Sequence, residues 1–278
     1  MFLETYLNKE QFSCGMGKSI GVISLKGGVG KTSTVVALGA ALSSFDKKVL
    51  LIDGNLSSPN LGLHLNVLEP ERTINHVLDR SLNPSQAIYE LDNFDLIPAS
   101  VFGNFNINPL KLKDRVKSLK RKYDIIIFDS SPALNEETLS VMLASDQILV
   151  VTTPDVPTLG MTMKAVKLAK QRGTPISGLV LNKVHGKNFE LSIDDIEKTA
   201  EVPVLAVIPH DVNILRALSE FTPSTIHKPK SISSDEYKKL AAILIGEKYK
   251  PLRFKDFFRI GPKRQEINRE IFYESVFG

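Results

Sequence analysis

The chain has 278 residues, of which 42% are hydrophobic and 24% charged, and its formal net charge is +4. This length fits one large α/β domain with short extensions, and two full domains would be crowded. The mild net charge excludes binding of nucleic acid or membrane by bulk charge alone. Any such surface must come from the local placement of basic residues.

Cys14 is the only cysteine, so the chain has no internal disulfide, and a cysteine-ligated zinc or iron–sulfur site within one chain is disfavoured. No run approaches the roughly 20 apolar residues that a membrane span requires. These features predict a protein of the reducing cytoplasm that is soluble or peripheral to a membrane.

Short apolar runs alternate with helical patterns along the chain. The runs read as buried strands are 19–25, 48–53, 94–98, 124–129, 147–152, 176–182 and 204–208. The helical patterns are 32–44, 109–122, 135–144, 158–172, 193–200, 212–219 and 233–247, and the expected loops are 182–190 and 222–234. This alternation predicts a doubly wound, mostly parallel α/β sheet with helices on both faces. The expected divisions are an N-terminal extension (1–18), a main α/β domain (19–248) and a C-terminal tail (249–278).

A glycine-rich loop joins the first expected strand to the first expected helix. Its proposed nucleotide-binding residues are Lys26, Gly27, Gly28, Val29, Gly30, Lys31, Thr32 and Ser33. The glycines let backbone N–H groups curl around phosphate oxygens at a helix N-terminus, where anions are favoured. Lys31 would reach the β- and γ-phosphates, and Thr32 would ligate Mg²⁺. Leu25 stands where the usual P-loop pattern has glycine, so the loop is a variant.

An aspartate closes the buried run 124–129 and supplies a second element of a nucleotide site. Asp129 has the form of a Walker B aspartate and would hold Mg²⁺ directly or through water. The residues that follow, 130–133, could form a switch that senses the γ-phosphate.

Three segments, Lys26–Thr32, Leu51–Asp53 and Ile126–Pro132, resemble the deviant Walker A ATPases of the MinD/ParA family, over about residues 19–247. The segments 60–62, 130–132 and 151–154 are closer to MinD-like proteins, archaeal ones above all, than to plasmid partition ATPases.

The resemblance implies a P-loop NTPase fold, with residues 19–248 as the P-loop ATPase domain. It also implies cofactors and roles for individual residues. The cofactors would be ATP or ADP and Mg²⁺, and the metal ligands Thr32, Asp53 and Asp129. Lys26 would cross an ATP-bound sandwich dimer to the partner's phosphates, which makes it catalytic together with Lys31. The adenine side would be formed by Asn182, Pro209 and Asp211.

One residue departs from the family pattern. Asn55 occupies the position near the attacking water where the family commonly has a second aspartate after Asp53. Asparagine accepts a hydrogen bond from water but not its proton, so we expect Asn55 to support slow hydrolysis and a long-lived ATP-bound dimer.

The composition changes after the last core helix. The segment from Lys248 to Arg264 is strongly basic and contains Phe254, Phe257 and Phe258 at helical spacing. It could pack on the domain as an ordinary terminal helix, contact an anionic membrane surface, or bind DNA or protein.

The sequence therefore predicts a slow cytoplasmic Mg-dependent ATPase, ATP hydrolysis giving ADP and phosphate. Its ATP-dependent homodimer would act as a spatial-positioning switch, with an activator or cargo protein as partner and peripheral association with the inner face of the cell membrane. The alternatives are a ParA-like partition ATPase that binds DNA nonspecifically, and a nucleotide-binding scaffold without turnover.

Overall fold

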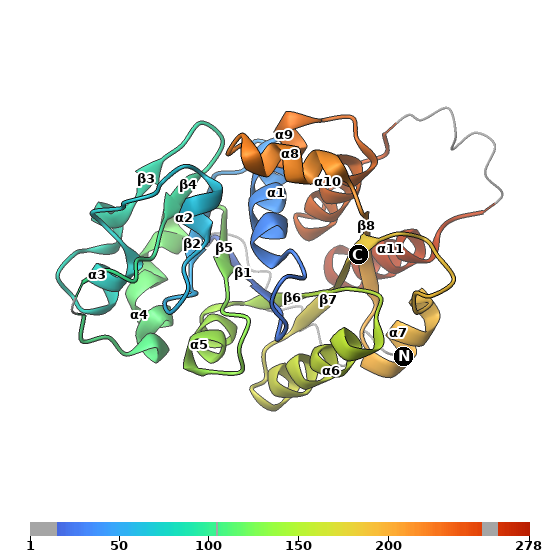
Figure 1. The fold of residues 1–278 in the computed structure, drawn as a ribbon, viewed down its shortest axis with the longest axis horizontal. Helices are drawn as coiled ribbons and strands as arrows, with labels where there is room; N and C mark the ends of the chain where they lie inside the picture. The colour runs from blue at the N-terminus through green and yellow to red at the C-terminus, as the bar shows by residue number, and fades with distance from the viewer. Residues whose placement is uncertain (1–15, 104, 252–260) are drawn as a thin grey trace.

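The computed structural model describes residues 16–103, 105–251 and 261–278. Its central feature is one eight-stranded sheet in the order β3-β4-β2-β5-β1-β6-β7-β8 (Figure 1). The strands are β1 (Lys18–Ile23), β2 (Val49–Asp53), β3 (Tyr89–Glu90), β4 (Asp95–Ile97), β5 (Ile125–Asp129), β6 (Gln147–Thr152), β7 (Ile176–Val184) and β8 (Val204–Pro209). Only β3 runs antiparallel to its neighbour; the other adjacent pairs are parallel. The predicted doubly wound sheet is confirmed.

The central strands β1, β2, β5 and β6 are mostly apolar because both faces of the sheet are covered. In β2, Leu50 and Ile52 enter one hydrophobic core, whereas Val49 and Leu51 enter the other. Successive side chains of a strand point to opposite faces, so one buried strand contributes to two cores.

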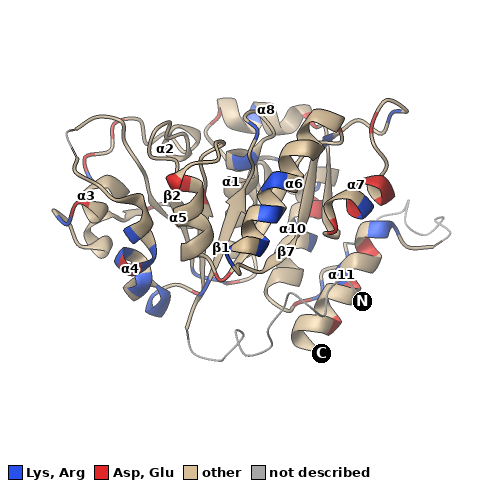
Figure 2. Ribbon diagram, turned by 90° about the horizontal axis from the view of Figure 1, so that it is seen from below, with Lys and Arg blue, Asp and Glu red and all other residues tan. Residues whose placement is uncertain are grey.

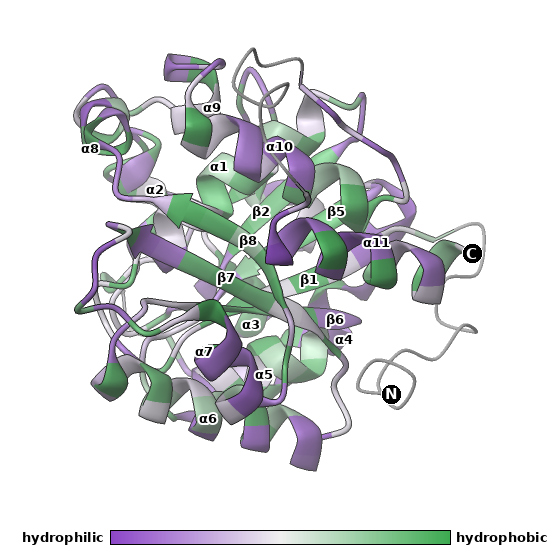
Figure 3. Cartoon of the chain, turned by 90° about the vertical axis from the view of Figure 1, so that its right-hand side faces the viewer, coloured by the Kyte–Doolittle hydropathy of each residue, from purple (hydrophilic) through white to green (hydrophobic). Residues whose placement is uncertain are grey.

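Helices line both faces of this sheet (Figures 1 and 3). One core includes residues of α1 (Lys31–Ser43), α10 (Ile232–Leu244) and α11 (Arg264–Phe277). The other includes residues of α3 (Ile74–Leu78), α4 (Leu112–Val116), α5 (Glu136–Ala144), α6 (Val156–Gln171) and α7 (Ile193–Ala200). The remaining helices are α2 (Leu61–His64), α8 (Val212–Ser219) and α9 (Ser224–His227), with 3₁₀ turns at Pro84–Ala87, Pro109–Lys111 and Lys117–Arg121.

Several short elements differ from the sequence prediction. The helix expected over 109–122 is a five-residue α-helix between two 3₁₀ turns, and the loop expected over 222–234 contains α9 and the start of α10. The other predicted loop, 182–190, begins later because β7 runs to Val184. Elements of two to five residues such as β3, α2 and α3 carry too little periodicity to be recognised from sequence. Their positions depend on tertiary contacts.

Helix α11 packs against the edge strand β8. The Asn268 amide donates to the Val204 carbonyl at 2.8 Å, and the Arg269 guanidinium donates to the Leu205 carbonyl at 2.8 Å. Phe272 is fully buried in the same core as α1 and α10. The end of the chain therefore covers the β8 side of the sheet, while the domain boundaries expected from composition stay predictions.

No helix in the described ranges combines the length and apolar character needed to cross a bilayer.

Candidate nucleotide site

The glycine-rich loop lies between β1 and α1, as the sequence predicts. Gly30 immediately precedes α1 with a φ of 88°, in the left-handed region that favours glycine. A Cβ at this position would lie 2.3 Å from the Asn182 amide nitrogen. Both the backbone conformation and the close approach of Asn182 therefore require glycine here.

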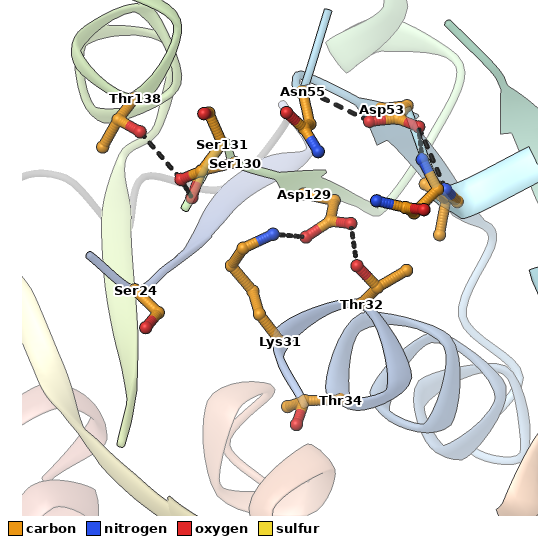
Figure 4. Close-up of polar contacts among 12 residues, drawn as sticks. Ser24, Lys31, Thr32, Thr34, Asp53, Asn55, Asp129, Ser130, Ser131 and Thr138 are labelled. Carbon is orange, nitrogen blue, oxygen red and sulfur yellow. Dashed lines mark hydrogen bonds and ion pairs between the residues drawn. The ribbon is translucent and has the colours of Figure 1, made fainter. Parts of the chain in front are cut away.

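Lys31, Thr32 and Asp129 form one buried cluster (Figure 4). The Lys31 ammonium lies 2.5 Å from one carboxylate oxygen of Asp129, and the Thr32 hydroxyl donates to the other at 2.6 Å. The side chains of Lys31 and Asp129 are 7% and 1% exposed, so the pair is shielded from water. The loop and the end of β5 thus meet as the two motifs predict.

Asp53 ends β2 beside Asp129 on β5, its partner in the parallel register. Its carboxylate accepts backbone N–H groups of Asn55, Asn60 and Leu61 at 3.0 to 3.1 Å. Burial and the neighbouring charge of Asp129 raise the pKa of Asp53, against the opposing effect of these hydrogen bonds and of Lys31. Asp53 therefore holds the segment after β2 against the sheet.

The oxygens at these strand ends fit a magnesium ion. Two carboxylates, Asp53 and Asp129, and the Thr32 hydroxyl are hard oxygen donors at the mouth of one phosphate loop. Mg²⁺ is usually held by one or two carboxylates together with substrate phosphates and water. Within the described ranges, no group of three or more His, Cys, Asp or Glu side chains could hold a metal by itself. The donor set thus suits an ion that arrives with a nucleotide.

Lys26 lies in a different environment from Lys31. Its ammonium contacts an Asp155 carboxylate oxygen at 3.2 Å and the Thr158 hydroxyl at 2.5 Å, and its side chain is 41% exposed. Burial acts to raise the pKa of Asp155, but hydrogen bonds from Thr153, Thr158 and Lys26 outweigh it and lower that pKa to about 2. The carboxylate is therefore charged throughout the neutral range.

Asn182 and Lys183, at the end of β7, support the outer side of the glycine-rich loop. The Asn182 amide donates to the Val29 carbonyl at 2.8 Å, and the Lys183 ammonium donates to the Gly28 carbonyl at 2.6 Å. Lys183 was not among the predicted binding residues. Its backbone has a positive φ of 57°, and the residue type alone does not reveal this conformation.

Asn55 is buried beside the cluster. Its amide group donates to the Ser58 carbonyl, while its side-chain oxygen is buried and has no hydrogen-bond partner among the described residues. A buried acceptor without a donor costs about 1–3 kcal/mol, so a ligand or water would be stabilised at this oxygen.

A cavity of about 490 Å³ is lined by the glycine-rich loop, the segment after β2 and the ends of β7 and β8. All predicted nucleotide-binding residues line it: Lys26, Gly27, Gly28, Val29, Gly30, Lys31, Thr32, Ser33, Asn182, Pro209 and Asp211, together with Asn55. Asp211 also caps α8, since its carboxylate accepts the Asn213 N–H at 2.9 Å. Two further wall residues, Asn60 and Pro132, belong to segments singled out in the sequence. The other wall residues, which were not proposed as binding residues, are His64, Lys183, His210, Ile214, Leu215, Leu218 and Tyr237.

The chain is similar to known families and to an ATP-binding protein. Residues 17–173 match a family model described as an AAA domain, and residues 116–245 match one described as a NUBPL iron-transfer P-loop NTPase. An uncharacterized ATP-binding protein of Methanocaldococcus jannaschii is 33% identical, with 84% of this chain and 90% of that protein covered.

Two solved structures are similar in fold and sequence. The cell division ATPase MinD of Pyrococcus furiosus has a TM-score of 0.77 at 36% identity, covering 81% of this chain and 97% of that one. The septum site-determining protein MinD of Pyrococcus horikoshii, complexed with Mg-ADP, has a TM-score of 0.78 at 33% identity, covering 82% and 96%. The expected cofactors, ATP or ADP and Mg²⁺, are those of such P-loop ATPases. The chain belongs to the MinD/ParA family of deviant Walker A P-loop ATPases.

Proposed function

We propose that this protein is a Mg-dependent ATPase whose ATP-bound form is a sandwich dimer that acts as a spatial-positioning switch in the cytoplasm. The enzyme activity, ATP hydrolysis to ADP and phosphate, would set the lifetime of the dimer. A cargo or activating protein would be the partner that reads the state of the switch.

The observation that carries this proposal is the different placement of two lysines in one loop. Lys31 is buried against Asp129, where it is ready to contact a phosphate bound by the same subunit. Lys26 is half-exposed and held by Asp155 and Thr158. A second cation at the rim of a phosphate site is attracted by nucleotide charge, and stabilising that charge from another subunit is an established strategy in phosphoryl transfer.

The contact with Asp155 gives Lys26 a defined position in the single chain. An exposed ion pair of this kind contributes about 1 kcal/mol or less, so a nucleotide phosphate of a second subunit could displace it. The pKa of Asp155 is lowered from its ordinary value of 3.8 to about 2, so the ion pair is fully present above pH 3.8 and is lost as the pH falls through about 2. Near neutral pH, release of Lys26 would depend on the nucleotide rather than on protonation.

Replacing Lys26 by alanine tests the dimer. In solution molar mass measurements, the wild type should be dimeric with ATP and monomeric with ADP or without nucleotide, because only ATP carries the γ-phosphate that Lys26 would reach. Lys26→Ala should stay monomeric with ATP while still binding it. Lys164→Ala, which removes an exposed lysine of α6, is the matched control and should dimerise normally. A wild type that is monomeric under all three conditions would refute the dimer.

Asn55 is the reason to propose slow turnover. Its free side-chain oxygen can orient the attacking water but cannot accept a proton near neutral pH. If wild-type turnover were absent, the protein would be a nucleotide-binding scaffold; turnover that Lys31→Ala abolishes would exclude that alternative.

We propose that the dimer acts at an anionic membrane surface through the basic and aromatic segment Lys248–Arg264. Most of that segment, residues 252–260, lies outside the described residues. A basic segment with aromatic residues suits a membrane interface, and two copies in a dimer bind more strongly than one through avidity.

A basic surface on the described part of the molecule favours a second candidate, nonspecific DNA binding. Lys111, Lys113, Lys117 and Arg121 are exposed on and beside α4, where Figure 2 shows a cluster of basic residues. Lysine and arginine rows of this kind neutralise DNA phosphates, and such binding weakens steeply with salt.

Two binding measurements with ATP separate the candidates. We expect the full chain to pellet with anionic liposomes, and expect a variant with Phe254, Phe257 and Phe258 replaced by serine to stay in the supernatant, because it loses its apolar contact. Lys113→Glu/Lys117→Glu should still pellet. The opposite pattern would favour a ParA-like partition ATPase. In that case the wild type would be retained on duplex DNA, and retention would fall with added salt and in Lys113→Glu/Lys117→Glu.

A further inference from the structure

The segment after β2 contributes three polar side chains to one wall of the nucleotide cavity: Asn55, Asn60 and His64. Asp53 fixes this wall because its carboxylate accepts the backbone N–H groups of Asn60 and Leu61, at the start of α2. His64 is the last residue of α2. The start of the helix that carries His64 is therefore held by Asp53, one of the proposed magnesium ligands.

His64 lines the nucleotide cavity together with Lys31 and Asn55. The charges of Asp129 on β5 and Lys31 on α1 act on its ring. Pro209, Asp211 and apolar residues of α8 line the same cavity. The imidazole therefore shares one cavity with the lysine of the phosphate loop.

The ring of His64 is available for a ligand. Neither ring nitrogen has a hydrogen-bond partner in the part of the chain that the structure describes. Burial lowers the pKa of His64; the charge of Asp129 opposes this, and the charge of Lys31 adds to it. A neutral imidazole has one nitrogen that accepts a hydrogen bond and can take a proton.

His64 supplies a proton-accepting group, which the amide of Asn55 does not. The orphaned oxygen of Asn55 can accept a hydrogen bond from a water molecule, which orients it, but an amide cannot remove a proton. A neutral imidazole on the same wall can do so. The sequence alone offered no reason to connect these two residues, which are nine positions apart.

We propose that His64 is a catalytic residue of this ATPase, accepting the proton of the water that Asn55 orients toward the γ-phosphate. The water oxygen forms a bond to the γ-phosphorus while the bond from that phosphorus to the bridging oxygen breaks, and the electron pair of that bond stays on ADP. One water proton passes to the imidazole and then to the released phosphate. This inference rests on the proposed ATPase activity.

His64→Gln tests the role, because glutamine keeps a polar side chain but cannot take a proton. We expect kcat for ATP hydrolysis to fall by about 100-fold, at the low end of general-base contributions, with KM for ATP within about twofold of wild type. Adding Asn55→Asp to His64→Gln should recover at least about tenfold, because a carboxylate then stands beside the water. Leu63→Gln, on the exposed side of the same helix, should leave kcat unchanged.

The controls separate failure of this inference from failure of the proposed function. Unchanged ADP affinity in His64→Gln would show that the site is folded. If wild type hydrolyses ATP in a Lys31-dependent manner and His64→Gln keeps wild-type kcat, or changes only KM, the role of His64 is refuted and the ATPase stands. If wild type does not hydrolyse ATP at all, the proposed function itself fails.

Discussion

Lys31→Met should slow ATP hydrolysis by about 100- to 1000-fold and also destabilise the protein without nucleotide. The ammonium of Lys31 is the buried cation closest to Asp129, and the cluster includes the raised-pKa carboxyl of Asp53 on the neighbouring strand. Removing a cation aimed at phosphoryl charge costs about 100- to 1000-fold in turnover. Leaving a buried carboxylate without its partner costs about 3–5 kcal/mol of unfolding free energy.

Two measurements separate these effects. Urea unfolding without nucleotide should show the loss of stability in Lys31→Met, and the double variant Lys31→Met/Asp129→Asn should recover most of it, because the orphaned charge is gone. Phosphate release should stay at least about 100-fold below that of the wild type in both variants. Turnover at the wild-type rate in Lys31→Met would remove Lys31 from the phosphate site, and equal stability of the single and double variants would contradict a buried ion pair.

Phe272→Ala is the second change with a large expected effect. Phe272 is fully buried between α11 and the core that includes α1 and α10, and its side chain leaves a cavity when truncated. Phenylalanine-to-alanine changes in such positions cost about 3–5 kcal/mol. We expect a shift of that size in the urea unfolding of the full chain, with nucleotide binding retained under conditions where the variant is folded.

An exposed neighbour provides the control. Ile271 lies on the same helix with 45% of its surface exposed, and Ile271→Ala should change stability by no more than about 0.5 kcal/mol. Equal effects of the two changes would show that α11 is not packed on β8 in solution. The result also decides how membrane binding is tested, because deletion of the whole C-terminal end would remove Phe272 and destabilise the domain.

At the C-terminal end of the described chain, packing places a helix that composition alone did not place. The sequence after Lys248 reads as a basic, aromatic segment followed by a mixed-charge one, and composition alone left several surfaces open. Helix α11 is positioned by Asn268 and Arg269, whose side chains donate to carbonyls of β8. Such contacts join residues more than sixty positions apart, and no local pattern encodes them.

The position of the glycine-rich loop between a strand and a helix was predictable from the sequence because its requirements are local. The loop from Lys26 to Thr32 needs glycines for its backbone, a lysine and a hydroxyl within a few residues, flanked by a strand and a helix. Asp129 was also readable, because a carboxylate at the end of a buried strand reaches the same edge of a parallel sheet as the loop. These requirements leave a signal in any single sequence.

The sequence by itself determined the doubly wound fold, the phosphate loop and the carboxylates beside it, because periodicity and motif spacing are properties of neighbouring residues. Only the tertiary structure decided that Lys26 contacts Asp155, that the side-chain oxygen of Asn55 has no hydrogen-bond partner among the described residues, and that His64 lines the same cavity as Lys31. The physical reason is that the surroundings of these three side chains include residues far away in the sequence. The sheet brings those residues together when its strand ends and covering helices pack.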